Sequence, residues 1–263
     1  MEVIDIFGIN VFADLSACVG INLISMHNHG FAANSNRNDL VNQVKLFEQN
    51  GWKLICVFED DLINRFNIVV SRCLNALGRT PNRIFARKCQ VVDIEKRVGA
   101  KFINENHIQG TPPGAFRYSG LMYNGNLVSV ASVGRARFST SADYELLRFA
   151  SLTNHQVVGG ASKILNHLFR DLEGGIVSYA DRRYGAGEVY SACGFQFSEE
   201  SSPCYWYYKP EHPEKKWHRS AFQKHKLPKL LETFDIQRTE LDNMKENGYF
   251  RIFDAGNMVF LRN

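Results

Sequence analysis

The apolar and polar positions of the first 80 residues follow two patterns, one typical of strands and one typical of helices. Residues 3–12, 19–24 and 52–58 predict short strands. The second is predicted to be buried because apolar and polar residues do not alternate in it, and the third is also predicted to be buried. Apolar residues spaced three and four apart at 38–50 and 62–77 predict two helices, and Asn50-Gly51 is a good C-terminal stop for the first. The pattern therefore predicts a small α/β lobe over residues 1–80.

A second series of elements begins near residue 84. Asn124-Gly125, between the apolar residues 121–123 and 127–133, predicts a hairpin with a two-residue turn. A strand at 144–150, a glycine turn at 156–161 and a helix at 162–170 follow. A further strand at 176–180 leads through a polar turn to a short helix that carries Tyr190.

The remainder of the chain is aromatic and then basic. Residues 205–208 are predicted to be the last strand of the sheet in the second domain, and residues 240–247 a helix. Residues 249–254 are predicted to pair with 258–261 as a terminal hairpin. The expected domains are therefore a lobe at 1–80, a domain at 84–210 and a basic extension at 211–263.

Charge is distributed unevenly, although the net charge is only +4. Residues 1–61 contain three Lys or Arg against eight Asp or Glu, whereas residues 62–101 contain nine against two. Residues 209–229 are also basic, with seven Lys or Arg against two Glu. Such stretches favour a polyanionic partner, although solvated basic faces also occur on ordinary enzymes.

Cysteine usage and hydropathy predict a reduced, cytoplasmic setting. The six cysteines include no Cys-x-x-Cys pair, and several lie in apolar runs as buried free thiols do. No apolar run approaches the roughly 20 residues that span a bilayer. We expect no membrane partner, and the oligomeric state is left open.

The main functional signal lies between Tyr144 and Phe197, where a strand, a turn with Gly159 and Gly160, and a helix follow one another. Glycine lets backbone N–H groups approach an anion, and the helix N-terminus adds about half a positive charge. A phosphate group is therefore the expected ligand of the turn.

This stretch resembles the GNAT acyltransferases. Gln156-x-x-Gly159-x-Ala161 is similar to the Gln/Arg-x-x-Gly-x-Gly/Ala turn that binds the acyl-CoA pyrophosphate in that family, and Tyr190-x-x-x-Gly194-Phe195 is similar to the tyrosine and Gly-Phe of the next βα unit. The resemblance implies a GNAT-like mixed sheet flanked by helices, with residues 91–94 as its first strand and residues 96–106 as its first helix. It also implies acetyl-CoA or another acyl-CoA as cofactor. It assigns the cofactor contacts to Gln156, Val158, Gly159, Gly160, Ala161 and Ser162.

Acyl transfer needs a group that accepts the amine proton and an acid for the departing thiolate. Under the GNAT resemblance Glu145 is the candidate base and Tyr190 the candidate acid. Asp181 and Arg148 join them because Ser178-Tyr179-Ala180-Asp181 resembles a segment of the Mom group of phage DNA-modification proteins, GNAT-like enzymes that alter adenine. A buried Asp–Arg pair could orient an acceptor base, or these charged groups could form structural ion pairs.

The N-terminal lobe resembles the very-short-patch repair endonucleases and the EDxHD homing endonucleases of phages, most strongly from Arg37 to Leu62. Asn10 and Asn22 stand where that family has acidic residues. Because an amide lacks the negative charge that usually holds Mg²⁺, the nuclease site is predicted to be degenerate, and no metal site is expected.

Three other polar groups each have two interpretations. His27-Asn28-His29 could bind a transition metal or be ordinary loop residues. Glu59-Asp60-Asp61 could hold a metal or favour the dipole at a helix start. His107 could be an acceptor-side base or a polar residue that closes a helix.

These observations predict an α+β protein, encoded by a phage, whose GNAT-like domain acylates nucleic acid, with DNA favoured over RNA. Alternatives are a DNA-binding protein of homing-endonuclease descent whose GNAT-like part serves recognition, and an active nuclease using Glu59, Asp60 and His27. The expected nucleic-acid contacts are Arg87, Lys88, Arg135, Arg137, Arg182, Arg183 and Lys224.

Overall fold

The computed structural model describes residues 1–27 and 36–263, and the chain divides into two compact units. Unit 1 consists of Met1–Phe66 and Ser202–Gly256, and unit 2 of Asn67–Ser201 and Asn257–Asn263. Each unit is thus built from two separate stretches of the chain, unlike the three consecutive ranges expected from the sequence.

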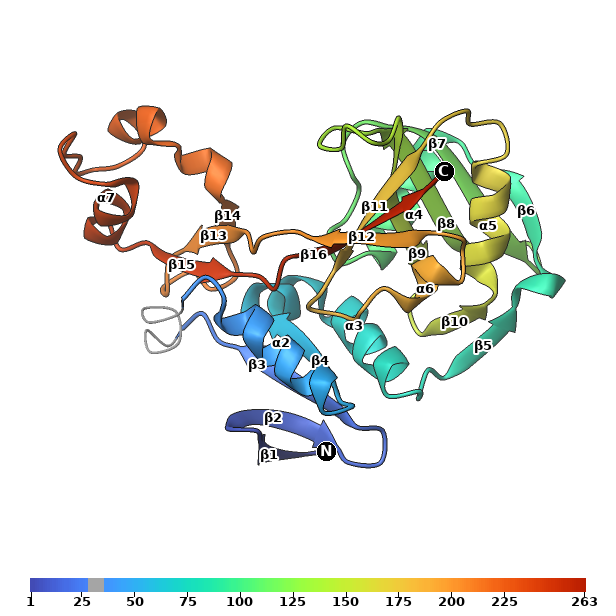
Figure 1. Ribbon diagram of the computed structural model, residues 1–263, viewed down its shortest axis with the longest axis horizontal. Helices are drawn as coiled ribbons and strands as arrows, with labels where there is room; N and C mark the ends of the chain where they lie inside the picture. Colours follow the sequence, from blue (N-terminus) through green and yellow to red (C-terminus); the bar gives the residue numbers. More distant parts are fainter. Residues whose placement is uncertain (28–35) are drawn as a thin grey trace. The chain divides into compact units, whose positions relative to one another are not determined.

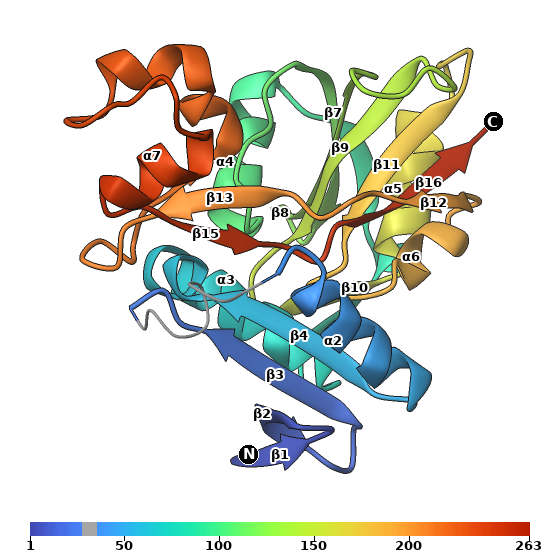
Figure 2. The ribbon, with the colours of Figure 1, turned by 60° about the vertical axis from the view of Figure 1, so that its left-hand side comes forward.

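Unit 1 contains a four-stranded sheet in the order β1-β2-β3-β4 (Figure 1). β3 and β4 are parallel and are joined by α2, which lies along one face of the sheet (Figure 2). The predicted strand at 3–12 is instead two antiparallel strands, because Phe7 and Gly8 have φ angles of 56° and 80° and reverse the chain. The elements are β1 (Glu2–Ile6), β2 (Ile9–Asp14), β3 (Val19–Ile24), α2 (Asp39–Gln49) and β4 (Lys53–Phe58).

The rest of unit 1 is formed by residues 202–256, which include a three-stranded sheet in the order β14-β13-β15. Tyr208 and Ile252 are buried in the core of the four-stranded sheet, whereas Tyr207 and Met244 belong to a separate core. The elements are β13 (Tyr205–Tyr208), β14 (Lys216–His218), β15 (Phe250–Phe253), α7 (Glu240–Glu246) and the 3₁₀ helices η2 (Arg219–Phe222) and η3 (Lys224–Lys229).

Two predictions for this region are wrong. β13 is not the last strand of the larger sheet, because it pairs with β14 and β15. The terminal hairpin is also absent, since β15 pairs with β13 while the final strand pairs with strands of unit 2.

Unit 2 is built on a seven-stranded mixed sheet in the order β12-β16-β11-β9-β8-β7-β6. Neighbouring strands are antiparallel except β9 and β11, which are parallel. The predicted α+β fold class, a mixed sheet flanked by helices, is confirmed. The strands are β6 (Gln90–Asp93), β7 (Ala115–Tyr123), β8 (Asn126–Arg135), β9 (Tyr144–Ser151), β11 (Ile176–Asp181), β12 (Gln196–Glu200) and β16 (Asn257–Arg262).

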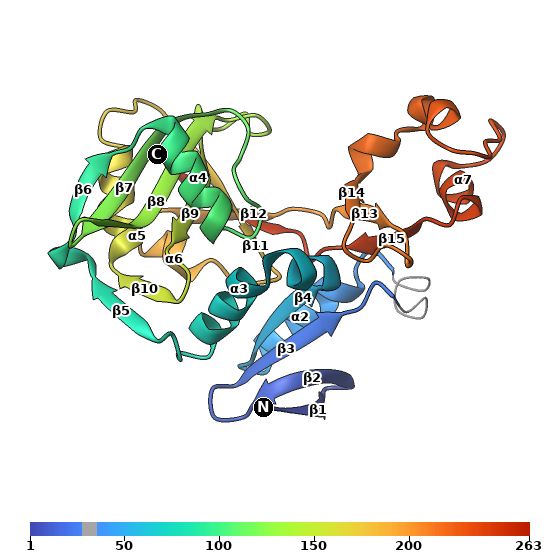
Figure 3. The ribbon, with the colours of Figure 1, turned by 180° about the vertical axis from the view of Figure 1, so that it is seen from behind.

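Helices cover both faces of this sheet (Figures 1 and 3). α4 (Lys96–Asn106) packs Phe102 and Ile103 against one face, and α5 (Gly160–Leu168) packs Ile164 and Leu165 against the other. The short helix α6 (Glu188–Ser191) carries Tyr190.

Three further elements complete the fold. α3 (Glu59–Ala76) runs from unit 1 into unit 2 and is interrupted at Arg65, where φ is −134°. β5 (Asn82–Phe85) and β10 (His155–Val158) form a parallel pair, and the 3₁₀ helix η1 (Ala86–Lys88) follows β5. Across the described residues, no helix is long and apolar enough to cross a membrane.

Candidate functional site

The parallel strands β9 and β11 part from each other within unit 2. Their pairing covers two residue pairs, the second being Glu145 with Val177, although β9 continues to Ser151 and β11 to Asp181. β9 also contains a bulge, because Leu147 has no partner in the register with β8. Bulges bend a strand and often lie next to active sites. The two strands therefore diverge at the point where the catalytic residues were expected.

The predicted glycine turn forms the N-terminus of α5. Gly159 is the N-cap residue and has a φ of 74°, a conformation that glycine adopts without strain. The first helical hydrogen bond runs from the Lys163 N–H to the Gly159 carbonyl, at 3.1 Å, and no side chain caps the helix. The N–H groups of Gly160, Ala161 and Ser162 have no backbone acceptor among the described residues, so they are donors for an anion.

The residues of the turn are either small or at least partly exposed. A Cβ on Gly160 would lie 2.9 Å from Cγ1 of Val157, so a larger residue does not fit without a shift of the chain. Gln156 and Val158 lie on β10, the first exposed and the second half-buried. The structure thus brings all six predicted cofactor-binding residues together at one helix N-terminus.

Glu145 is a buried carboxylate at the point where β9 and β11 part. Its side chain belongs to a residue that is 7% exposed, and its Oε2 has no hydrogen-bond partner among the described residues. Burial raises the pKa of Glu145 above its ordinary value, and the charges of Arg137 and Arg148 oppose part of this shift. A carboxylate with a raised pKa is suited to accept a proton near neutral pH.

Tyr190 approaches the same strands from α6. Its ring stacks on Phe260 with the centroids 4.9 Å apart, and its hydroxyl is hydrogen-bonded to Ser178. The Ser178 hydroxyl donates to the Leu146 carbonyl at 3.2 Å, which links β11 to β9 just beyond their last pair. Burial raises the pKa of Tyr190, so its hydroxyl keeps its proton at neutral pH.

Arg148 links the two candidate catalytic groups electrostatically. Its Nη1 donates to the Leu147 carbonyl at 2.6 Å, and its Nε donates to the Gly110 carbonyl at 3.4 Å. Burial lowers the pKa of Arg148, while the charges of Glu145 and Tyr190 act in the opposite direction. The guanidinium remains a cation at any physiological pH. Glu145, Arg148 and Tyr190 therefore form one interacting group.

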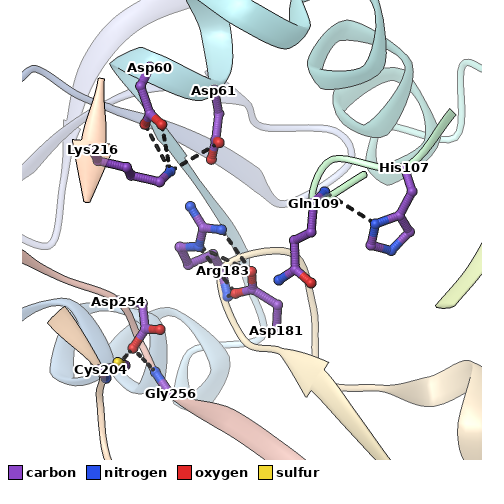
Figure 4. Close-up of polar contacts among 10 residues, drawn as sticks. All are labelled: Asp60, Asp61, His107, Gln109, Asp181, Arg183, Cys204, Lys216, Asp254 and Gly256. Atoms are coloured by element: carbon purple, nitrogen blue, oxygen red, sulfur yellow. Dashed lines mark hydrogen bonds and ion pairs between the residues drawn. The ribbon is translucent and has the colours of Figure 1, made fainter. Parts of the chain in front are cut away.

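Asp181 lies outside this group and pairs with Arg183 (Figure 4). Arg183 Nη2 is 2.8 Å from Oδ2, and the Arg183 backbone N–H donates to Oδ1 at 3.1 Å. Burial by itself would raise the pKa of Asp181, but the charge and hydrogen bonds of Arg183 outweigh it and hold this pKa below its ordinary value. The expected pair of Asp181 with Arg148 is thus replaced by a local pair two residues apart.

The expected nucleic-acid contacts divide into buried and exposed arginines and lysines. Arg182 and Arg183 are 2% and 5% exposed, and Arg182 Nη1 lies 3.2 Å from Glu200 Oε2. Buried guanidinium groups beside carboxylates do not present donors to a phosphate backbone, which corrects the expectation for these two. The exposed members are Arg87, Lys88, Arg135 and Arg137 in unit 2 and Lys224 in unit 1.

The acidic residues that open α3 contact basic side chains. Glu59 Oε1 is 2.6 Å from His27 Nδ1, and the Lys216 ammonium lies 2.8 Å from Asp60 Oδ2 and 3.1 Å from Asp61 Oδ1 (Figure 4). Within the described ranges, no group of three or more His, Cys, Asp or Glu is arranged to hold a metal ion. His29, the other predicted ligand, lies outside the described residues.

The asparagines of the N-terminal sheet add no charge to such a site. Asn10 is exposed on β2, and the Asn22 side chain on β3 donates to Gln43 Oε1 at 3.2 Å. His107 is the C-cap residue of α4, and its Nδ1 accepts the Gln109 N–H at 3.2 Å (Figure 4). His107 therefore closes the helix, which is one of its two predicted roles.

Sequence reasoning named Ser178 only as part of a motif and missed its role between the strands. Ser178 is 1% exposed and lies in the middle of β11, between apolar residues. A buried hydroxyl almost always has a hydrogen-bond partner, so a serine inside an apolar strand is the signal that could have identified it.

Comparisons with known proteins found similarity among solved structures but none in sequence. The sequence matches no protein-family model, and it matches no curated protein. Among solved structures, the chain is similar to N-acetylglutamate synthase from Neisseria gonorrhoeae complexed with coenzyme A and N-acetyl-glutamate, with 12% sequence identity and a TM-score of 0.34. The similarity covers 92% of this chain and 50% of that one, so this chain spans about half of that protein's length.

Proposed function

We propose that this chain is an acyl-CoA-dependent N-acyltransferase of the GNAT type. The proposal is carried by two features of unit 2: the pair of parting parallel strands, β9 and β11, and a helix that begins at Gly159 without a side-chain cap. A helix N-terminus with free N–H groups favours a phosphate or diphosphate group.

The residues of unit 2 fit such a ligand. The N–H groups of Gly160, Ala161 and Ser162 would hold the pyrophosphate, and the absence of a Cβ at Gly160 and Gly159 lets the backbone approach it. Bound acyl-CoA supplies the acyl group as an activated thioester. The parting of β9 and β11 leaves the backbone groups of both strands beyond Glu145 and Val177 unpaired with each other.

Two side chains would move protons in the transfer. Glu145 would take the proton of the attacking amine, directly or through a water molecule, as the new N–C bond forms. Tyr190 would give its proton to the sulfur atom as the C–S bond breaks. A base with a raised pKa and an acid that stays protonated at neutral pH match these roles. Arg148 would fix the position of both groups through its charge.

Nucleic acid is the proposed acceptor, with a DNA base as in the Mom group as its most specific form. The support is the set of exposed basic side chains in unit 2, Arg87, Lys88, Arg135 and Arg137. Exposed lysine and arginine supply the sequence-independent part of nucleic-acid binding.

Calorimetry with acetyl-CoA tests the cofactor, and a transfer assay with labelled acetyl-CoA and DNA tests the reaction. Gly159→Glu places a negative side chain in the turn and should abolish binding. Gly51→Glu is the matched control, because Gly51 has the same φ of 74° and no atom within 4 Å of a built Cβ. If the parent protein does not bind acetyl-CoA, the proposal is wrong.

A second candidate function is DNA binding without acyl transfer, by a protein of homing-endonuclease descent. It is favoured by the N-terminal sheet, in which Asn10 and Asn22 carry no charge for a metal ion. Gel-shift assays at two salt concentrations and a cleavage assay with Mg²⁺ would distinguish it, with Asn10→Asp as the variant. Salt-sensitive DNA binding without labelled product would select this function over acyl transfer.

A further inference from the structure

The parallel pair of β5 and β10 lies outside the seven-stranded sheet and leads directly into the glycine turn (Figure 1). Arg83 on β5 is in register with Gln156 on β10, and Phe85 lies two residues further along the same face of β5. The alternate residues Ile84 and Val157 are buried in the core of unit 2. Arg83, Phe85 and Gln156 therefore project from the opposite face, where all three are exposed.

Two guanidinium groups flank the ring of Phe85. The guanidinium carbon of Arg87 lies 5.2 Å from the ring centroid, and that of Arg83 lies 5.6 Å from it. Neither arginine has a carboxylate partner among the described residues, and residues 67–92 contain no Asp or Glu. Phe85 is 39% exposed. This face of β5 and η1 thus combines an accessible aromatic ring with two positive charges that the protein does not neutralise.

η1 is held against the first turn of α5. Lys163 Nζ donates to the carbonyl oxygens of Ala86 at 3.0 Å and Cys89 at 2.6 Å. A Cβ built on Gly159 would lie 3.7 Å from the Cβ of Ala86, so the backbone of η1 adjoins the turn. The backbone of η1, which carries Arg87, is therefore held next to the first turn of α5 by the Lys163 side chain.

We propose that the face formed by Arg83, Phe85 and Arg87 binds the adenosine 3′-phosphate end of acyl-CoA. The inference rests on the proposed function, because the neighbouring turn at Gly159 is the site proposed for the pyrophosphate. Arginine offers paired, planar donors to phosphate oxygens, and a purine ring stacks on an aromatic side chain. Coenzyme A carries a pyrophosphate and a separate phosphate on one adenosine, which matches an anion site at the glycine turn and a second one, with an aromatic ring, on the adjoining β5 and η1.

Titration calorimetry of the full chain with coenzyme A and with dephospho-coenzyme A, which lacks only the 3′-phosphate, tests the subsite. The parent protein should bind coenzyme A about tenfold more tightly than the dephospho form, as expected for charge-assisted hydrogen bonds to one phosphate. Arg83→Gln and Arg87→Gln should each remove most of this preference while leaving the affinity for dephospho-coenzyme A nearly unchanged. Arg97→Gln, at an exposed arginine of α4, is the control and should keep the preference.

The contribution of the Phe85 ring is tested by separate substitutions. Phe85→Ala should weaken both ligands by a similar factor, about tenfold, because both carry the same adenine, and Phe85→Trp should restore binding. Thermal unfolding of each variant should match the parent, since the substituted side chains are exposed.

Each possible result decides between the proposals. If the parent binds both ligands equally, or if the two arginine variants weaken both alike, the subsite is refuted while the acyltransferase proposal stands. If neither ligand binds the parent, both proposals are wrong. If Arg83→Gln and Arg87→Gln weaken binding of duplex DNA and leave the preference for coenzyme A intact, the face is a nucleic-acid contact and the subsite is refuted.

Discussion

Glu145→Gln separates a catalytic role of this buried carboxylate from a structural one. Glutamine keeps the size of the side chain but does not accept a proton. Removal of a general base slows a reaction by about 10²–10⁴-fold, which corresponds to about 2.7–5.4 kcal/mol of activation free energy. We expect the rate constant for acyl transfer to fall by this factor while the dissociation constant for acetyl-CoA stays the same, because Glu145 is not among the residues proposed to hold the cofactor.

The same substitution should stabilise the protein at neutral and alkaline pH. The pKa of Glu145 in the folded protein lies above its ordinary value of 4.5, so folding favours the protonated form. The stabilisation that protonated Glu145 provides is complete below pH 4.5, and it is lost as the pH rises through the pKa of Glu145 in the folded protein. At higher pH Glu145 is ionised but stays buried with an unpartnered Oε2, which lowers the free energy of unfolding by about 1–3 kcal/mol. Because Arg137 and Arg148 reduce the cost, we expect the lower end of this range.

Urea unfolding of the parent and Glu145→Gln between about pH 4 and about pH 8 measures the effect, with Glu173→Gln at an exposed position as the control. The free energies of unfolding of parent and variant should diverge as the pH rises, with the variant becoming the more stable. Parallel curves would refute the reasoning about burial. Full activity of the variant would refute the assignment of Glu145 as the base.

Two further substitutions test other parts of the molecule. Lys216→Met removes the ammonium group that the buried Asp60 and Asp61 share, so the free energy of unfolding should fall by about 3–5 kcal/mol in urea, whereas Lys215→Met, at an exposed position, should leave it unchanged. Tyr190→Phe keeps the stacked ring but removes the acid, so the transfer rate should fall by about 10²-fold or more while the melting temperature stays near that of the parent; an unchanged rate would exclude Tyr190 as the acid.

Elements with strong local signals could be predicted from the sequence. The helix that the GNAT resemblance implied at residues 96–106 is α4 with the same bounds. The hairpin between β7 and β8 was also correct, since Asn124 and Gly125 adopt positive φ angles of 49° and 78°. In both cases the residues that decide the structure are neighbours in the chain.

Long-range pairings could not be predicted in this way. The pattern of residues 205–208 indicates a strand but does not say which sheet it joins, and β13 proved to belong to unit 1. The pairing of β10 with β5 was not foreseen either, because short apolar runs carry no information about a partner distant in sequence.

In the candidate site, too, the features that depend on long-range pairing could not be predicted. The glycine turn, Glu145 and Tyr190 could be named from motifs, but their burial and the Ser178 link depend on the sheet. The pairing of Asp181 with Arg183 was open to prediction, since residues two apart in a turn are close enough for an ion pair.

Residues 202–256 are inserted between β12 and β16, which are neighbouring strands in the seven-stranded sheet of unit 2. The ends of the insertion are adjacent, because the Ser201 N–H donates to the Asn257 carbonyl at 2.8 Å and the Asn257 N–H donates to Ser201 Oγ at 2.9 Å. β12 and β16 are antiparallel, so an Asn-Gly turn in place of residues 202–256 should close them as a simple hairpin. Residues 67–201 alone lack β16, the strand between β11 and β12, and should not fold. Circular dichroism and urea unfolding would compare the two chains. If residues 67–201 fold by themselves, β16 is dispensable. If the chain in which an Asn-Gly turn joins β12 to β16 is unfolded, unit 2 depends on unit 1 for its stability.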